Sequence, residues 1–121
     1  MTKRTDAQVQ ALWRTVLAVI CARTGLKLTY VLEQVPYVGS AKRNLLQQQA
    51  NGCRHLAIYL LRTNYGVPIT QLGRVAELSH QQVHRVITFV ARSRDENMRD
   101  YDEWLGSYEQ TLDTMGEHVD A

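Results

Sequence analysis

Apolar residues recur along the first part of this chain at the three- and four-residue spacing of one helix face. The pattern predicts a helix over 6–24. Thr5 or Asp6 can cap its start, and Gly25 can end it. The apolar stripe consists of Val9, Leu12, Trp13, Val16, Leu17 and Ile20.

Between this helix and the next long apolar pattern, the sequence "LTYVLEQ" (28–34) predicts a short helix that begins at Thr29. Pro36 and Gly39 then predict a turn or loop, because both residues interrupt regular structure. Ser40 is a candidate cap for the polar helical stretch that follows it.

A second apolar stripe spans residues 41–65 but contains a turn signal at Asn51 and Gly52. Two interpretations fit this pattern: one uninterrupted helix, or a new helix that Asn51 caps. We favour a break or kink at the dipeptide. Gly66 and Pro68 end the stripe.

Two shorter apolar patterns follow, and they predict helices over 69–77 and 80–94. Only Leu78 and Ser79 separate them, so the two helices must cross steeply, as in a helix-turn-helix. The inner faces are expected to consist of Leu72, Val75 and Ala76 in the first helix and of Val83, Val86, Ile87 and Val90 in the second.

Details of this pair support the prediction. Gly73 is small where the two helices would approach each other. Ser79 and Gln82 have the spacing of a capping box at the start of the second helix. Glu77 stands where such turns often carry glycine, which constrains the turn.

The remaining residues, 95–121, are expected to form an acidic helix over 95–115. Its apolar stripe is short for a coiled coil, so packing on the same domain is favoured over a homodimer. The stripe consists of Met98, Tyr101, Leu105, Tyr108, Leu112 and Met115.

Composition places the chain among globular all-α proteins. Its 121 residues fit one domain, 45% of them are hydrophobic, and only two prolines occur. We expect a compact helical domain with a central helix-turn-helix, and a cytoplasmic location, because neither a membrane span nor a signal-peptide core is evident. Cys21 and Cys53 lie in apolar helical patterns and are expected to be buried, reduced thiols.

The net charge of +2 conceals a division along the chain. Residues 1–94 hold thirteen Lys or Arg against three Asp or Glu, a net charge of +10. Residues 95–121 hold one Arg against nine Asp or Glu, a net charge of −8. A basic domain attracts polyanions, and nucleic acid is the foremost of these.

Enzyme and metal chemistry find little support. His80 and His84 stand four residues apart and could share a metal ion, but a zinc protease needs a glutamate where Gln81 stands. No third ligand is evident, and neither a nucleophile elbow nor a phosphate-binding loop occurs. We therefore expect no enzyme, no cofactor, no metal and no small-molecule substrate.

The helix predicted over 80–94 suits a DNA major groove. With Val83 at the centre of the inner face, about 100° per residue places four residues on the opposite side. These are Gln81, Arg85, Thr88 and Arg92. Gln pairs with adenine, Arg with guanine, and Thr contacts the thymine methyl group. The alternative interpretation is that these residues form the solvated face of an ordinary helix.

From Val16 to about Leu112 the chain resembles the C-terminal DNA-binding domain of the bacterial replication initiator DnaA, a Trp-repressor-like helix-turn-helix. "CRHLAIYLLRTNYGVPITQLGR" resembles that domain's R-x-I/L-A-x-Y-L-x-R helix and the L-x-x-I-G that follows. "SHQQV" stands at its D-H-T-T-V signature, which contacts bases. Only His80 and Val83 keep the family residue, so the resemblance implies a different target sequence. The resemblance covers the DNA-binding domain and does not extend to the initiator's ATPase domain.

The resemblance and the helix geometry together give a set of expected contacts with double-stranded DNA. Base-reading residues are expected to be Ser79, His80, Gln81, Gln82, Arg85 and Thr88. Residues expected at the DNA backbone are Lys42, Arg43, Arg54, Thr70, Gln71, Arg74 and Arg92. Lys42 and Arg43 occupy the segment where the family inserts an arginine into the minor groove.

The expected function is therefore a sequence-specific DNA-binding protein acting in transcription regulation. The alternative is a non-enzymatic protein-interaction module, or a replication-control factor that acts on the initiator or its origin sites. A third option is that the acidic segment folds over the basic face and competes with DNA. A homodimer remains open, because single modules bind tightly when paired.

Overall fold

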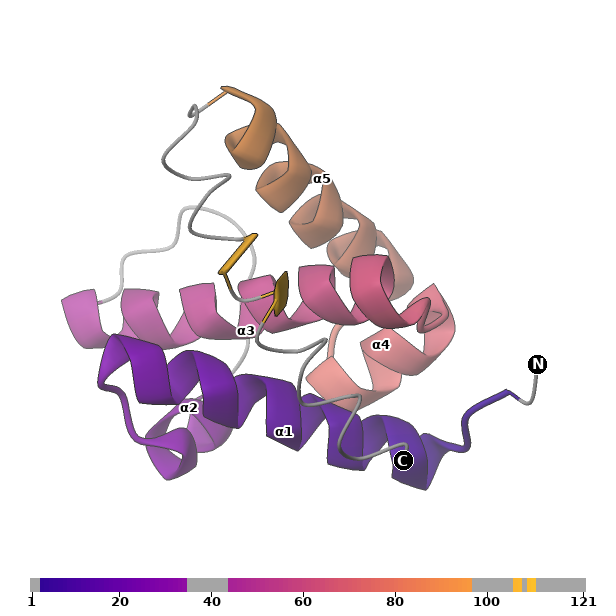
Figure 1. The fold of residues 1–121 in the computed structure, drawn as a ribbon, viewed down its shortest axis with the longest axis horizontal. Coiled ribbons are helices and arrows are strands. Elements are labelled where there is room, and N and C mark those ends of the chain that lie inside the picture. Colours follow the sequence, from indigo (N-terminus) through magenta and orange to yellow (C-terminus); the bar gives the residue numbers. More distant parts are fainter. Residues whose placement is uncertain (1–2, 35–43, 97–105, 108, 111–121) are drawn as a thin grey trace.

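The computed structural model describes residues 3–34, 44–96, 106–107 and 109–110. Across these ranges the chain is helical and contains no strand, which confirms the predicted all-α class (Figure 1). The elements are α1 (Asp6–Thr24), α2 (Leu28–Glu33), α3 (Leu45–Tyr65), α4 (Ile69–Ala76) and α5 (His80–Glu96).

Helix α1 has the predicted bounds, and local chemistry explains both ends. The Thr5 hydroxyl accepts from the Gln8 amide at 3.2 Å, and the Gln8 side chain accepts from the Thr5 amide at 2.8 Å. Gly25 ends the helix in the left-handed conformation, with φ of 81°, which glycine adopts without steric cost. The predicted start and stop signals of α1 are confirmed.

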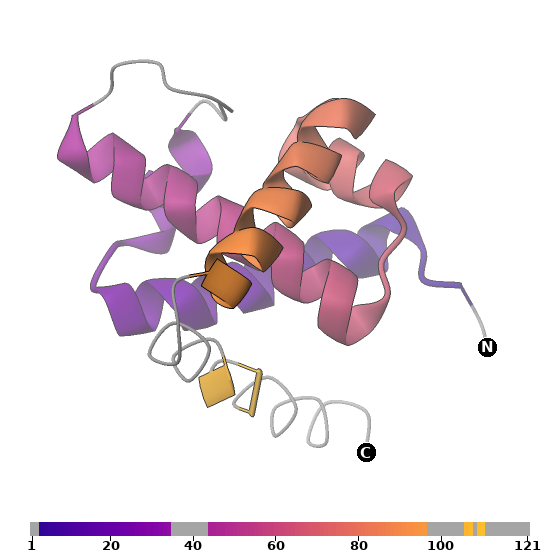
Figure 2. The ribbon, with the colours of Figure 1, turned by 90° about the horizontal axis from the view of Figure 1, so that it is seen from above.

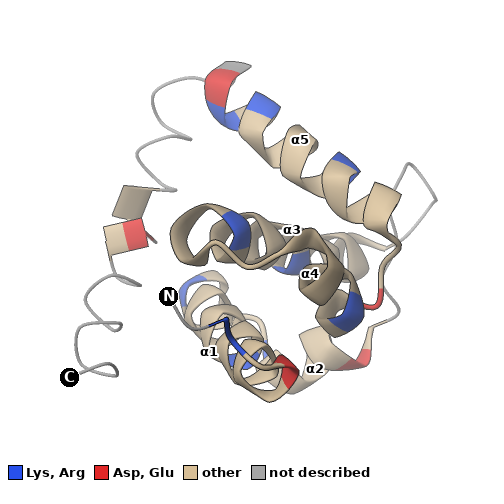
Figure 3. Ribbon diagram, turned by 90° about the vertical axis from the view of Figure 1, so that its right-hand side faces the viewer, with Lys and Arg blue, Asp and Glu red and all other residues tan. Residues whose placement is uncertain are grey.

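Helix α3 lies between α1 and α5, as Figure 1 and the end-on view of Figure 3 show. It is therefore buried around most of its circumference, as expected for a helix with apolar residues on several faces. Its fully or nearly fully buried apolar residues are Ala50, Cys53, Leu56, Ala57, Ile58, Leu60 and Leu61.

The break that we favoured at Asn51 and Gly52 is wrong, because α3 continues through both residues. Asn51 is buried, and its side-chain amide bonds the His55 ring, one turn further along the same helix, at 3.2 Å. Packing on α1 and α5 therefore overrides the local turn preference. The cap is also corrected: Asn44, rather than Ser40, caps the helix that contains Leu45.

Helices α4 and α5 are joined by three residues and pack against each other. Glu77 ends α4 in the left-handed conformation, with φ of 59°, and the Leu78 amide donates to the Gly73 carbonyl at 3.0 Å. A Cβ atom built on Gly73 would lie 2.8 Å from the Leu78 carbonyl oxygen. Glycine is therefore required there, as the sequence indicated.

The boundary between α5 and the acidic segment lies two residues later than predicted, because α5 continues to Glu96. Most of the helix expected over 95–115, with all of its apolar stripe, lies outside the described residues. Among those described, Ser107 accepts from Arg23 Nη1 at 2.6 Å, and Glu109 pairs with Arg94 at 2.7 Å. These contacts join the segment to α1 and α5.

Figure 2, seen from above, shows α5 lying across α3. None of the helices in the described part of the chain combines the length and the apolar character needed to cross a membrane.

Candidate nucleic-acid interface

The candidate interface is the outer face of α5. Its inner residues, Val83, Val86 and Val90, are buried in the core. The four residues that the helical geometry placed on the outer face are exposed; they are Gln81, Arg85, Thr88 and Arg92. His84, on the flank, is exposed as well. The basic residues of α5 are spread along the helix, whereas its acidic residues stand at its C-terminal end (Figure 3).

The start of α5 is fixed by a capping box, which confirms the predicted local geometry. The Ser79 amide donates to Gln82 Oε1 at 2.9 Å, and the Gln82 amide donates to the Ser79 hydroxyl at 3.2 Å. Both side chains are therefore engaged with the backbone. They hold the helix start in place. Of the neighbouring glutamines, Gln81 is exposed and Gln82 is half-buried.

His80 and His84 lie one turn apart on α5, with ring centroids 4.8 Å apart in an edge-to-face arrangement. Within the described ranges, no group of three or more His, Cys, Asp or Glu residues is placed to hold a metal ion. The pair therefore contributes two exposed ring donors or acceptors to the outer face of α5.

A hollow of about 200 Å³ lies between α4 and the start of α5. Thr70, Arg74 and His80 contribute polar groups to its lining. Thr70 and Arg74 are both exposed, which agrees with the placement expected for backbone-contacting residues. The Arg74 guanidinium already forms an ion pair within the protein, however, with Asp6 at 2.9 Å.

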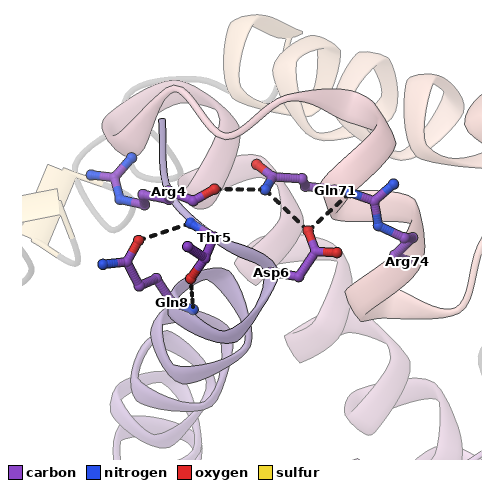
Figure 4. Close-up of polar contacts among 6 residues, drawn as sticks. All are labelled: Arg4, Thr5, Asp6, Gln8, Gln71 and Arg74. Carbon is purple, nitrogen blue, oxygen red and sulfur yellow. Dashed lines mark hydrogen bonds and ion pairs between the residues drawn. The ribbon is translucent and has the colours of Figure 1, made fainter. Parts of the chain in front are cut away.

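Gln71, expected at the DNA backbone, instead points into the protein (Figure 4). It is 5% exposed, and its side-chain nitrogen donates to the Arg4 carbonyl at 2.9 Å and to Asp6 Oδ1 at 3.2 Å. The expected phosphate contact of Gln71 is therefore corrected. Its amide ties α4 to the residues that begin α1.

Asp6 is the acceptor shared by this network. Hydrogen bonds from Arg74, and then from Gln71, hold the pKa of the Asp6 carboxyl below its ordinary value of 3.8. Asp6 therefore carries its negative charge beside Arg74 at neutral pH, which weakens the basic character of this edge of the candidate interface.

Arg54, also expected at the DNA backbone, is buried inside the domain at 5% exposure. Its Nη1 donates to the carbonyl oxygens of Val31 at 3.3 Å and of Gln34 at 2.6 Å. Its Nη2 donates to the carbonyl oxygen of Ala76 at 3.5 Å. Burial lowers the pKa of the guanidinium, and the nearby Glu77 charge opposes this shift. The expected phosphate contact is corrected to a structural role.

Thr70, Arg74 and His80 thus line one hollow between α4 and the start of α5, whereas Arg54 and Gln71 are turned inward. Lys42 and Arg43, the candidates for a minor-groove contact, lie outside the described residues.

The sequence pattern did not single out Phe89, although it lies on α5 with 65% of its surface exposed. A signal was available: about 100° per residue places Phe89 on the flank of α5, about 60° from Val86 and about 120° from Val83. The Phe89 ring lines a cavity between α1, α3 and α5, and it is not assigned to DNA contact.

Comparison with protein-family models, with curated proteins and with solved structures found no match for this chain. The resemblance to the initiator's DNA-binding domain therefore stays a prediction from the residues quoted above.

Proposed function

We propose that this chain binds double-stranded DNA, reads its sequence with α5 in the major groove, and acts as a transcription regulator. The observation that carries the proposal is the exposed outer face of α5, where Gln81, Arg85 and Thr88 point away from the core. The capping box of Ser79 and Gln82 fixes the start of this helix.

The chemistry of these side chains supports base reading. A glutamine amide can bond both N6 and N7 of adenine, and a guanidinium can bond O6 and N7 of guanine. Thr88 has a methyl group that can contact the thymine methyl and a hydroxyl that can donate to or accept from a base. Each good bidentate pair discriminates against a wrong base by about 1–3 kcal/mol.

Backbone positioning is assigned to Thr70, Arg74 and Arg92, which are exposed on α4 and α5. Residues 1–94 carry a net charge of +10, so counterion release from DNA favours binding. The Asp6 carboxylate pairs with Arg74, and a phosphate would have to compete with it for the guanidinium.

The test measures affinity for a pool of random duplexes and for the sequences selected from it, at several salt concentrations. Wild type is compared with the double variant Gln81→Ala/Arg85→Ala. Arg14→Ala is the charge-matched control, because Arg14 is exposed on α1, across α3 from α5. Wild type should select a sequence and show a steep negative salt slope.

The double variant should lose the sequence preference and weaken binding to the selected site by roughly 10- to 100-fold. Arg14→Ala should keep the preference. A wild type that selects no sequence at moderate salt would refute the proposal and favour the protein-interaction alternative, and so would a double variant that keeps the full preference.

A further inference from the structure

Away from its outer face, α5 also borders an apolar cavity. A cavity of about 320 Å³ opens between α1, α3 and α5, and we call it the α1–α3–α5 cavity. Its lining is largely apolar and includes Ile20, Gly52, Cys53, Leu56, Phe89 and Val90. This volume lies at the lower end of the range in which proteins bind small molecules, about 300–1,000 Å³.

Gly52 is the first indication that the α1–α3–α5 cavity is a binding site. It stands in the interior of α3, where glycine is the least favourable residue apart from proline. Close packing explains Gly73, but a Cβ atom built on Gly52 would meet nothing within 4 Å. No left-handed conformation is recorded for Gly52 either. What the absent side chain provides is room in the cavity.

Phe89 is the second indication. Its ring lines the cavity, yet 65% of the residue is exposed. Exposed aromatic surface beside an apolar hollow is a common feature of binding sites, because a ligand buries both together. The cavity is therefore flanked on one side by an aromatic ring and on another by the bare backbone of Gly52.

The lining also restricts the ligand's charge. Among the described residues that line the cavity there is no Lys, Arg, Asp or Glu. Burying an unpaired charge there would be costly, so the enclosed part of a ligand must be uncharged. Gln49 contributes a polar side chain that can bond a substituent on the ligand.

We propose that the α1–α3–α5 cavity binds a small, ring-bearing organic molecule, whose apolar ring packs between Gly52 and Phe89. The site goes beyond DNA reading and does not depend on it, since none of the described residues that line the cavity is assigned to DNA contact.

The test uses 1-anilinonaphthalene-8-sulfonate as the probe, with fluorescence titration and amide chemical shifts of the full chain. The key variant is Gly52→Leu, which fills the cavity with a side chain from α3. It should fold, because its Cβ atom has free space and leucine favours helix more than glycine does. Ala18→Leu, on the exposed face of α1, is the matched control for added apolar surface.

Wild type should bind one probe saturably, with the largest shifts at Gly52, Cys53 and Val90. Gly52→Leu should raise the melting temperature and weaken probe binding by about tenfold or more. Ala18→Leu should bind like wild type. Unsaturable binding, equal affinity in Gly52→Leu, or shifts away from the cavity would each overturn the proposal.

Sedimentation velocity without the probe distinguishes a ligand from a second copy of the chain. The proposal expects wild type and Gly52→Leu to sediment identically. A wild-type dimer that Gly52→Leu dissociates would assign the cavity to the partner copy and overturn the proposal. None of these measurements contains duplex DNA. A negative result for probe binding therefore leaves the proposed DNA function intact, and a negative result for DNA binding leaves the proposed cavity site intact.

Discussion

The carboxylate of Asp6 and the guanidinium of Arg74 lie 2.9 Å apart, which joins the first turn of α1 to the last turn of α4. The two residues are far apart in sequence, and both side chains are largely exposed. Gln71 bonds the same carboxylate oxygen from the buried side. These contacts thus hold the start of α1 against α4, the helix next to the candidate DNA-reading helix α5 (Figure 4).

Asp6 should titrate below the ordinary carboxyl pKa of 3.8, because Arg74 and Gln71 stabilise its charged form. A folded-state pKa below the unfolded value stabilises the fold above pH 3.8, and this contribution is lost as the pH falls through the lowered pKa. Carboxyl chemical shifts measured against pH check this. Arg74→Ala should raise the Asp6 pKa, whereas Arg62→Ala should leave it unchanged.

Arg54→Met should destabilise the domain by about 2–4 kcal/mol, because buried carbonyl oxygens that accept from the guanidinium lose their donor. Urea unfolding followed by circular dichroism measures the loss. Arg14→Met, at an exposed position of α1, is the control and should stay within about 0.5 kcal/mol of wild type. Equal stability of the two variants would contradict the structural role.

Gly73→Ala should destabilise the fold by about 1–2 kcal/mol, because the new Cβ atom would lie 2.8 Å from the Leu78 carbonyl oxygen. This steric cost outweighs the better helix propensity of alanine. Gly52→Ala is the matched control: it has free space and should stabilise by roughly 1 kcal/mol. The two substitutions should therefore shift the urea midpoint in opposite directions, and shifts of the same sign would contradict the close contact.

Glu77→Gly should stabilise the fold by about 0.5–1 kcal/mol, because Glu77 adopts a φ of 59° that glycine reaches without strain. Glu77→Ala removes the same charge but keeps the Cβ atom, so it should not gain this stability. Thermal melts of both variants separate backbone strain from the loss of the charge near Arg54. A Glu77→Ala variant as stable as Glu77→Gly would refute the strain.

Burial raises the pKa of the Cys21 thiol to about 11. A raised folded-state pKa means that the neutral thiol stabilises the fold below the ordinary value of 9.0, and that this contribution is lost as the pH rises toward 11. Stability measured from pH 8 to 11 should therefore fall more steeply in wild type than in Cys21→Ala. Parallel curves would contradict the burial of this thiol.

Local features of the fold could be predicted from the sequence because short-range chemistry decides them. The ends of α1 depend on Thr5 and Gly25, and the start of α5 depends on Ser79 and Gln82. The outward direction of Arg85 follows from the helical repeat once Val83 is placed in the core.

Features decided by distant segments could not be predicted. Nothing near Arg54 in sequence shows that it will meet carbonyl oxygens of Val31 and Ala76, and the resemblance placed it at the DNA backbone. Gln71 was misplaced for the same reason, since its partner Asp6 belongs to another helix. At Gly52 the turn signal was real, but packing of α3 overrode it.

The buried guanidinium of Arg54 has a consequence for how the domain opens. Helix α2 has six residues, too few to persist alone, and α4 has eight. One side chain from α3 bonds the C-terminal ends of both. Fraying either short helix removes acceptors from the guanidinium that also bonds the other one. We therefore expect α2, α3 and α4 to open as one cooperative unit, with amide protons that exchange together.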